Sequence, residues 1–113
     1  MRVLIVEDDE ALAQTLHWMS ELKGHAARAC RTGEEALSAF FEFLPTMVLI
    51  DLHLPDMPGI EVCERIRASE LGDQAKIWAH TAFDDNDLRA AKARCFDGWL
   101  IKGSDMRVLD TLL

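Results

Sequence analysis

Four short, largely apolar runs, each followed by a polar or charged residue, constrain the fold of this chain more than any other feature. They cover residues 3–6, 47–50, 76–80 and 98–101, and segments with helical spacing lie between them. Such alternation is typical of βαβ units, which build a parallel sheet covered by helices. The chain is long enough for one core. We therefore expect one α/β domain, 1–113, with a doubly wound five-stranded parallel sheet and helices on both faces.

The individual elements follow from hydrophobic spacing and turn residues. The expected strands cover about residues 2–6, 25–30, 47–51, 76–80 and 98–101. The expected helices cover about residues 10–23, 33–43, 60–69, 84–94 and 105–113. The inward stripe of the first helix consists of Leu12, Leu16, Met19 and Leu22. Thr32 and Glu35 form a capping box, Ser104 caps the last helix, and the alanine-rich strand 25–30 suits an edge position.

Charge and cysteine content limit the functions and the cellular compartments that this chain can have. The net charge of -8 disfavours direct nucleic-acid binding, because contact with phosphates requires positive charge. The sequence has no run of transmembrane length and no signal-peptide pattern, so we expect a cytoplasmic protein without membrane contact. Cys30, Cys63 and Cys95 are widely spaced and form no C-x-x-C motif. We interpret them as reduced, buried side chains, with a disulfide or metal role as the less favoured alternative.

The polar residues that follow the apolar runs predict a functional site. Asp8 and Asp9 follow the first run, Asp51 the second, Thr81 the third and Lys102 the last. In open parallel sheets, ligands bind outside the carboxyl ends of the strands. Each residue also has a simpler explanation, such as an acidic helix start, a turn acid or a solvated lysine. Together they form a set suited to a divalent cation and a phosphoryl group.

Four stretches of the chain resemble the receiver domain of response regulators, the chemotaxis-regulator-like phosphoacceptor domain of two-component phosphorelay systems. The stretches are residues 3–9, 47–59, 81–82 and 99–102, and their order and spacing fit the family. The resemblance covers the whole chain. It implies a flavodoxin-like fold with strand order 2-1-3-4-5.

The resemblance implies a phosphoacceptor site that depends on magnesium. Asp51 would take a phosphoryl group from the phosphohistidine of a histidine kinase or phosphotransfer protein. Asp9 and Asp51 would bind Mg²⁺ through their carboxylates, and the backbone carbonyl of His53 would be the third protein ligand. Asp8 would assist through a water molecule.

The resemblance also implies a switch. Lys102 would pair with the phosphoryl oxygens, and Thr81 would hydrogen-bond to one of them after transfer. Trp99 would be the switching aromatic side chain, which turns inward as the threonine moves. The helix over 84–94, the strand over 98–101 and the last helix would form the face that contacts an output domain or partner protein.

Some residues depart from the family pattern or surround the site. Glycine follows Lys102 where the family usually has a cis-proline, so we expect this loop to turn differently. We hypothesise that Phe83 shields the acyl phosphate and that His53 modulates the access of water. His80 is interpreted as a packed core histidine, because its side chain should face away from that of the following residue.

Alternatives to a phosphorylation-driven switch remain open. A degenerate receiver would act only through constitutive contacts, and the glycine after Lys102 motivates that interpretation. A small metal-dependent phosphatase would use Asp51 as nucleophile, but such enzymes usually need a second acid where His53 stands. Flavin binding would need a Ser/Thr/Gly-rich phosphate loop after the first strand, and the sequence has no such loop there. A receiver would catalyse only its own phosphorylation and dephosphorylation, and its short last helix suggests a module of a longer protein, although a stand-alone regulator also fits.

Overall fold

The computed structural model describes residues 1–82 and 95–113. Its strands are Arg2–Val6 (β1), Ala26–Cys30 (β2), Met47–Ile50 (β3), Lys76–Thr81 (β4) and Gly98–Ile101 (β5). Its helices are Glu10–Leu22 (α1), Gly33–Phe43 (α2), Gly59–Ala68 (α3) and Met106–Leu112 (α5). The expected helix over 84–94 and Phe83 lie outside the described residues.

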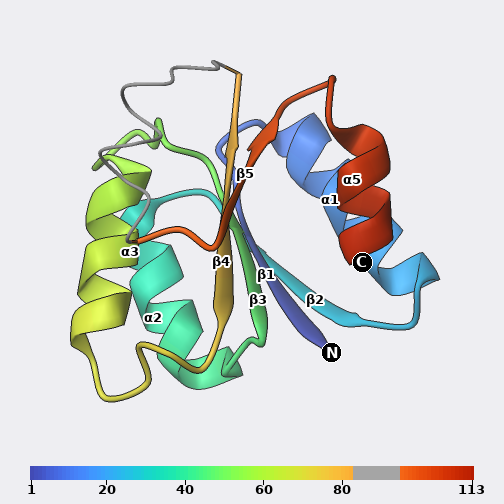
Figure 1. The fold of residues 1–113 in the computed structure, drawn as a ribbon. Coiled ribbons are helices and arrows are strands. Elements are labelled where there is room, and N and C mark those ends of the chain that lie inside the picture. The colour runs from blue at the N-terminus through green and yellow to red at the C-terminus, as the bar shows by residue number, and fades with distance from the viewer. Residues whose placement is uncertain (83–94) are drawn as a thin grey trace.

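The strands form one parallel sheet in the order β2-β1-β3-β4-β5, as expected. Helices α1 and α5 cover one face of the sheet, and α2 and α3 cover the other (Figure 1). The doubly wound α/β fold is therefore confirmed.

The central strand β3 shows why an uninterrupted apolar run is needed in this sheet. Val48 and Ile50 belong to the core cluster that contains side chains of α2 and α3. Met47 and Leu49 alternate with them and belong to the cluster on the side of α1 and α5. All four are buried, because helices cover both faces of the strand. By contrast, β2 lies at an edge and is largely exposed, as its alanine content predicts.

The helix ends agree with the sequence in part. The Oγ1 atom of Thr32 accepts a hydrogen bond from the backbone N–H of Glu35, as predicted. The Glu35 carboxylate accepts from the N–H of Arg31, at 3.4 Å, rather than from that of Thr32 itself. Leu22 was wrongly placed in the inward stripe of α1: it is the last residue of the helix and is 87% exposed.

The start of α5 also differs from the prediction. Ser104 does not cap this helix; Asp105 is its N-cap residue, and no side chain makes a cap hydrogen bond. The Asp105 carboxylate instead accepts from the backbone N–H of Ile101, at 2.7 Å. Gly103 adopts a φ of 83°, so the chain after Lys102 turns through a left-handed conformation that suits glycine.

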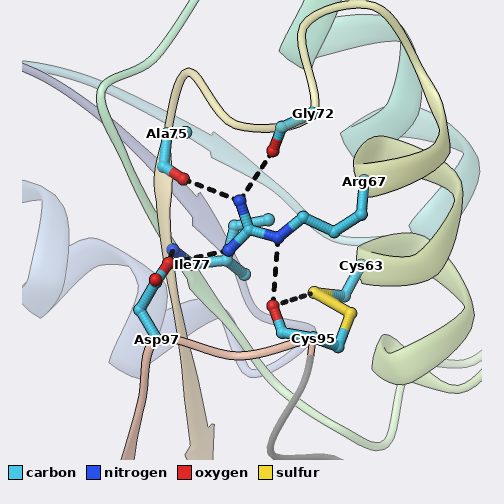
Figure 2. Close-up of a disulfide and its surroundings, with 7 residues drawn as sticks. All are labelled: Cys63, Arg67, Gly72, Ala75, Ile77, Cys95 and Asp97. Atoms are coloured by element: carbon cyan, nitrogen blue, oxygen red, sulfur yellow. Dashed lines mark hydrogen bonds and ion pairs between the residues drawn. A yellow bond between two sulfur atoms is a disulfide. The ribbon is translucent and has the colours of Figure 1, made fainter.

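The prediction of three reduced cysteines was wrong. Cys63 of α3 and Cys95, just before β5, form a disulfide (Figure 2). Cys30 is free and buried, and burial raises the pKa of its thiol to about 11. The sequence pattern missed the pair because the two cysteines lie 32 residues apart and meet only when α3 packs beside the segment before β5.

Arg67 reinforces the same junction (Figure 2). Its Nε atom donates to the carbonyl oxygen of Cys95 at 3.1 Å, and Nη1 donates to the carbonyl oxygens of Gly72 and Ala75. Its Nη2 atom lies 2.7 Å from Oδ2 of Asp97, which also accepts from the N–H of Ile77. One guanidinium group thus joins α3 to the segments before β4 and β5.

Among the described residues, no helix combines the length and the apolar character that crossing a bilayer requires.

Candidate functional site at the carboxyl edge of the sheet

The sheet brings the polar residues that follow its strands to one edge. In the strand register, Val6 of β1 pairs with Ile50 of β3, and Thr81 of β4 pairs with Ile101 of β5. The residues that follow β1, β3 and β5 therefore emerge at the same edge. Because β1 and β3 are neighbours, the acids after these two strands come close together.

Lys102 joins two of these acids. Its Nζ atom lies 2.8 Å from Oδ2 of Asp51 and 2.7 Å from Oε1 of Glu7. The backbone supports this position, because the N–H of Lys102 donates to the carbonyl oxygen of Thr81 at 2.7 Å. The side chain thus crosses the edge of β4, which separates β5 from β3.

The acids form a cluster suited to a hard cation. Carboxylate oxygens of Glu7, Asp8 and Asp51 all lie within 4.8 Å of one another. Glu7 and Asp51 are buried and Asp8 is exposed, so the cluster opens to solvent on the side of Asp8. Oxygen donors of this kind fit Mg²⁺, which binds through one or two carboxylates and keeps several waters.

The surroundings shift the pKa values of both Glu7 and Lys102. Burial raises the pKa of Glu7 to about 7, and the hydrogen bond from Lys102 opposes this effect. For Lys102, burial opposes the charged form, but the bonds to Asp51 and Glu7 outweigh it and raise the pKa of the ammonium group. Lys102 therefore stays charged, whereas Glu7 holds its proton more tightly than a solvated glutamate does.

Asp9 is not part of this cluster of carboxylates. Its Oδ1 atom accepts a hydrogen bond from the backbone N–H of Leu12, and Asp9 is the N-cap residue of α1. The N–H of Asp9 donates to the Glu7 carboxylate at 3.1 Å. The acidic pair nearest Asp51 is thus Glu7 and Asp8, where sequence analysis chose Asp8 and Asp9.

Glu7 is the site residue that sequence reasoning missed, although a signal was present. Glu7 directly follows Val6, and its N–H donates to the carbonyl oxygen of Cys30, which continues the pairing of β1 with β2 by one residue. An acid that prolongs a buried strand is held against the sheet, whereas an acid two residues later can turn toward the helix. Position relative to the last apolar residue would have identified Glu7.

Of the remaining predicted residues, Thr81 and His53 lie at this edge, whereas Trp99 lies within β5. Thr81 ends β4 and is buried. His53 is exposed, and its backbone N–H donates to Oδ1 of Asp51 at 3.0 Å. Trp99 is half-buried, packs against the cluster on the α2 and α3 side, and its ring meets that of Phe96 edge to face at a centroid distance of 6.0 Å.

His80 is buried, in line with its interpretation as a packed residue. Burial, together with the nearby positive charge of Lys102, lowers the pKa of its imidazole to about 4, against the opposing effects of Asp51 and Asp105. His80 is therefore neutral near pH 7 and adds no positive charge to the site.

Known proteins show which family shares this fold and acidic edge. The family described as response regulator receiver domain matches residues 3–113. This chain belongs to the response regulator receiver family. The receiver domain therefore serves two-component signalling, and the resemblance seen in the sequence is confirmed.

Curated relatives are longer than this receiver domain. Over 109 residues it is 34% identical to the transcriptional regulatory protein AfsQ1 of Streptomyces coelicolor, which matches 96% of this chain and 47% of that protein. Over 89 residues it is 33% identical to the cell cycle transcriptional regulator CtrA of Caulobacter vibrioides, which matches 79% of this chain and 38% of that protein. The chain thus spans less than half the length of these relatives.

Solved structures agree with the fold of the receiver domain. A CheY-like response regulator receiver domain from Methylobacillus flagellatus is 33% identical, covers 99% of this chain and 94% of its own, and superposes with a TM-score of 0.88. The response regulator TrrA from Thermotoga maritima, solved in complex with Mg²⁺ and BeF, is 27% identical with a TM-score of 0.85 and covers 98% of this chain and 94% of its own.

Proposed function

We propose that Asp51 is the phosphoacceptor of this receiver domain and that it takes a phosphoryl group from a phosphohistidine. The observation that carries the proposal is the contact of Lys102 with Asp51 beside the acidic cluster of Glu7 and Asp8. A buried carboxylate next to an ammonium group can accept a phosphoryl group whose new charge the same ammonium offsets. Phosphoryl transfer depends mainly on such positioning and charge neutralisation.

In the proposed reaction, a carboxylate oxygen of Asp51 attacks the phosphorus atom of the phosphohistidine. The new O–P bond forms as the P–N bond breaks, and the imidazole leaves with the electron pair and later takes up a proton. The product is an acyl phosphate on Asp51. The ammonium group of Lys102 pairs with the negatively charged phosphoryl oxygens, and the hydroxyl group of Thr81 donates a hydrogen bond to one of them.

The proposed protein ligands for Mg²⁺ are the carboxylates of Asp8 and Asp51 and the backbone carbonyl of His53. In this proposal Asp8 takes the place that sequence analysis gave to Asp9, because Asp9 caps α1. Glu7 takes the role first given to Asp8, in which an acid assists through water. When bound, the metal ion would offset the charge of the phosphoryl oxygens during transfer.

The test is intact-mass analysis after incubation with acetyl phosphate, with and without Mg²⁺. We expect one phosphoryl adduct on the parent protein, dependent on Mg²⁺, and none on Asp51→Asn. Asp73→Asn is the matched control, because Asp73 is exposed in the turn before β4, at the opposite edge of the sheet. An equal adduct on Asp51→Asn would reject Asp51 as the acceptor.

The degenerate receiver is the competing interpretation, and the position of Lys102 argues against it. The glycine that follows Lys102 raised that alternative, yet the lysine ammonium reaches Asp51 without a proline in the loop. If the parent takes up no phosphate and beryllofluoride leaves the fluorescence of Trp99 unchanged, the degenerate form becomes the better account. Gly103→Pro would then test whether the loop limits activity.

Partners and compartment belong to the same proposal. We propose a histidine kinase or phosphotransfer protein as phosphodonor, and an output domain or partner protein that contacts the face of β5 and α5; the predicted helix over 84–94 lies outside the described residues. Cytoplasmic localisation remains a prediction. Disulfides are uncommon in reducing compartments such as the cytoplasm. The redox state of Cys63 and Cys95 in cells therefore tests the predicted compartment, and a persistent disulfide would count against it.

A further inference from the structure

The loop after β3 folds back on itself beside Asp51. His53 and Pro58 form an isolated antiparallel bridge, and the N–H of Gly59 donates to the carbonyl oxygen of Leu52 at 2.9 Å. Leu52 is buried and belongs to the core cluster with α2 and α3. The base of the loop is therefore fixed to the core, and Leu54 and Met57 of its outer part, residues 54–57, pack against the same cluster.

Asp56 fastens the outer part of this loop to a different element. Its Oδ1 atom accepts from the N–H of Gly33 at 2.8 Å, and its Oδ2 atom accepts from the N–H of Glu34 at 3.0 Å. These are the first two residues of α2. The two bonds lower the pKa of the Asp56 carboxyl, so the group stays ionised and holds both N–H groups at neutral pH.

The contact is more than a helix cap. Helix α2 already has a local cap, because Thr32 accepts from the N–H of Glu35. Met57 adds a second link between the loop and α2: a Cβ atom built on Gly33 would lie 2.5 Å from Cγ of Met57, so a larger residue at position 33 would force the Met57 side chain to shift. The start of α2 therefore serves as an anchor for the loop.

We propose that Asp56 is a positioning residue for the metal site. By holding the loop against α2, it fixes the segment whose His53 N–H donates to Asp51 and whose His53 carbonyl is the proposed third ligand for Mg²⁺. The inference rests on the proposed function. Asp56 acts through the backbone of the loop and touches neither the metal ion nor the phosphoryl group.

Binding of Mg²⁺ tests this inference without phosphorylation. Calorimetric titration with MgCl₂ at constant ionic strength would compare the parent with Asp56→Ala, Asp56→Asn and Asp73→Ala. We expect Asp56→Ala to raise the Kd for Mg²⁺ about 10-fold, the size typical for groups that orient metal ligands. Asp56→Asn keeps one acceptor oxygen, so it should raise the Kd for Mg²⁺ less than Asp56→Ala does. Asp73→Ala removes the same charge at the opposite edge and should match the parent.

A kinetic measurement separates positioning from a general loss of structure. With acetyl phosphate, Asp56→Ala should need more Mg²⁺ for half-maximal phosphorylation yet reach the parent's rate at saturating Mg²⁺. Circular dichroism would establish that the variants are folded. Equal weakening by alanine and asparagine would assign the effect to charge and overturn the inference, as would an unchanged Kd in Asp56→Ala. If the parent itself binds no Mg²⁺, the proposed function fails together with the inference.

Discussion

The ammonium nitrogen of Lys102 lies 2.8 Å from a carboxylate oxygen of Asp51, although β4 separates the strands that carry the two residues. The same nitrogen lies 2.7 Å from Glu7. One positive charge thus holds together two buried carboxylates that would otherwise repel each other. The energetic dependence of the site on Lys102 can be measured without any phosphodonor.

Replacing Lys102 by methionine should destabilise the protein in a pH-dependent way. Without the ammonium group, Glu7 and Asp51 cannot both remain charged in their buried positions. The loss should be about 2 kcal/mol at pH 8, less than for a fully buried pair because water reaches part of the lysine. At pH 6 the loss should be smaller, because Glu7, with a pKa of about 7, is then largely protonated. Urea denaturation at both pH values measures the difference.

The control for Lys102 is Lys76→Met. Lys76 has a side chain that is 77% exposed and lies 3.9 Å from Asp97. Exposed ion pairs contribute little, so the change in unfolding free energy should stay below about 0.5 kcal/mol at either pH. An effect of Lys102→Met that is the same at pH 6 and pH 8 would contradict the assignment to Glu7.

His80 should make the folded protein less stable in acid. Its folded pKa of about 4 lies below the ordinary value of 6.5. The unfolded chain therefore binds a proton first as the pH falls, and the stability present above pH 6.5 is lost between about pH 6.5 and pH 4. The shift corresponds to about 3 kcal/mol at pH 4.

Comparison with His80→Gln isolates this effect. Glu7 titrates in the same window with the opposite sign: its raised pKa gives stability that is present below pH 4.5 and is lost as the pH rises through about 7. The difference between parent and variant removes this contribution. The unfolding free energy of the parent should fall relative to that of His80→Gln from pH 7 to pH 4; parallel curves would mean that His80 is not buried in its neutral form.

Gly59→Ala should disturb the loop that carries the site. A Cβ atom at Gly59 would lie 2.1 Å from the carbonyl oxygen of Asp51, which is backbone and cannot swing away. We expect a loss of about 2–3 kcal/mol from this clash, together with slower uptake of phosphate. Gly24→Ala is the control: its φ of 86° disfavours alanine, but no atom lies within 4 Å. It should cost about 1 kcal/mol and leave phosphate uptake unchanged, as thermal denaturation and intact mass would show.

Reduction of the disulfide should lower stability without unfolding the protein. A cross-link between residues 32 positions apart lowers the entropy of the unfolded chain, which stabilises the folded state by about 4 kcal/mol. The Arg67 bonds to Cys95 and Asp97 remain after reduction and keep α3 attached to the segment before β5.

Thiol labelling of the denatured protein checks the pairing. Only Cys30 should react without reductant, and all three cysteines should react after reduction. Cys63→Ser should remove the effect of reductant on the melting temperature, whereas Cys30→Ser should preserve it. Three reactive thiols in protein kept from reductant would show that the cross-link does not form.

The sequence predicted the strands well because each strand has a local cause, whereas their order came from the resemblance to receiver domains. The apolar run before Asp51 can be satisfied only by a strand covered on both faces, and the alanines of β2 suit an edge. Helix spacing failed at Leu22, because hydrophobic periodicity does not show where the neighbouring layer ends.

The contacts of the site were harder to predict because they join distant segments. Asp9 and Glu7 are chemically similar and two residues apart, and their distance from the last apolar residue of β1 decides which carboxylate faces Asp51. Asp56 reaches α2 from 23 residues away, and Cys63 meets Cys95 from 32 residues away. No local pattern encodes such pairs, whereas the strand ends at Asp51 and Lys102 follow from the chain itself.

The contact between Asp51 and Lys102 links β3 and β5, two strands that should differ in how readily they open. β3 lies in the centre and pairs with a strand on each side, whereas β5 pairs with β4 at an edge. Amide hydrogens of β3 should exchange with solvent only upon global unfolding, and those of β5 through smaller openings. The ion pair therefore ties the most slowly exchanging part of the sheet to one of its borders, and a change in charge at Asp51 should appear first in the exchange rates of β5.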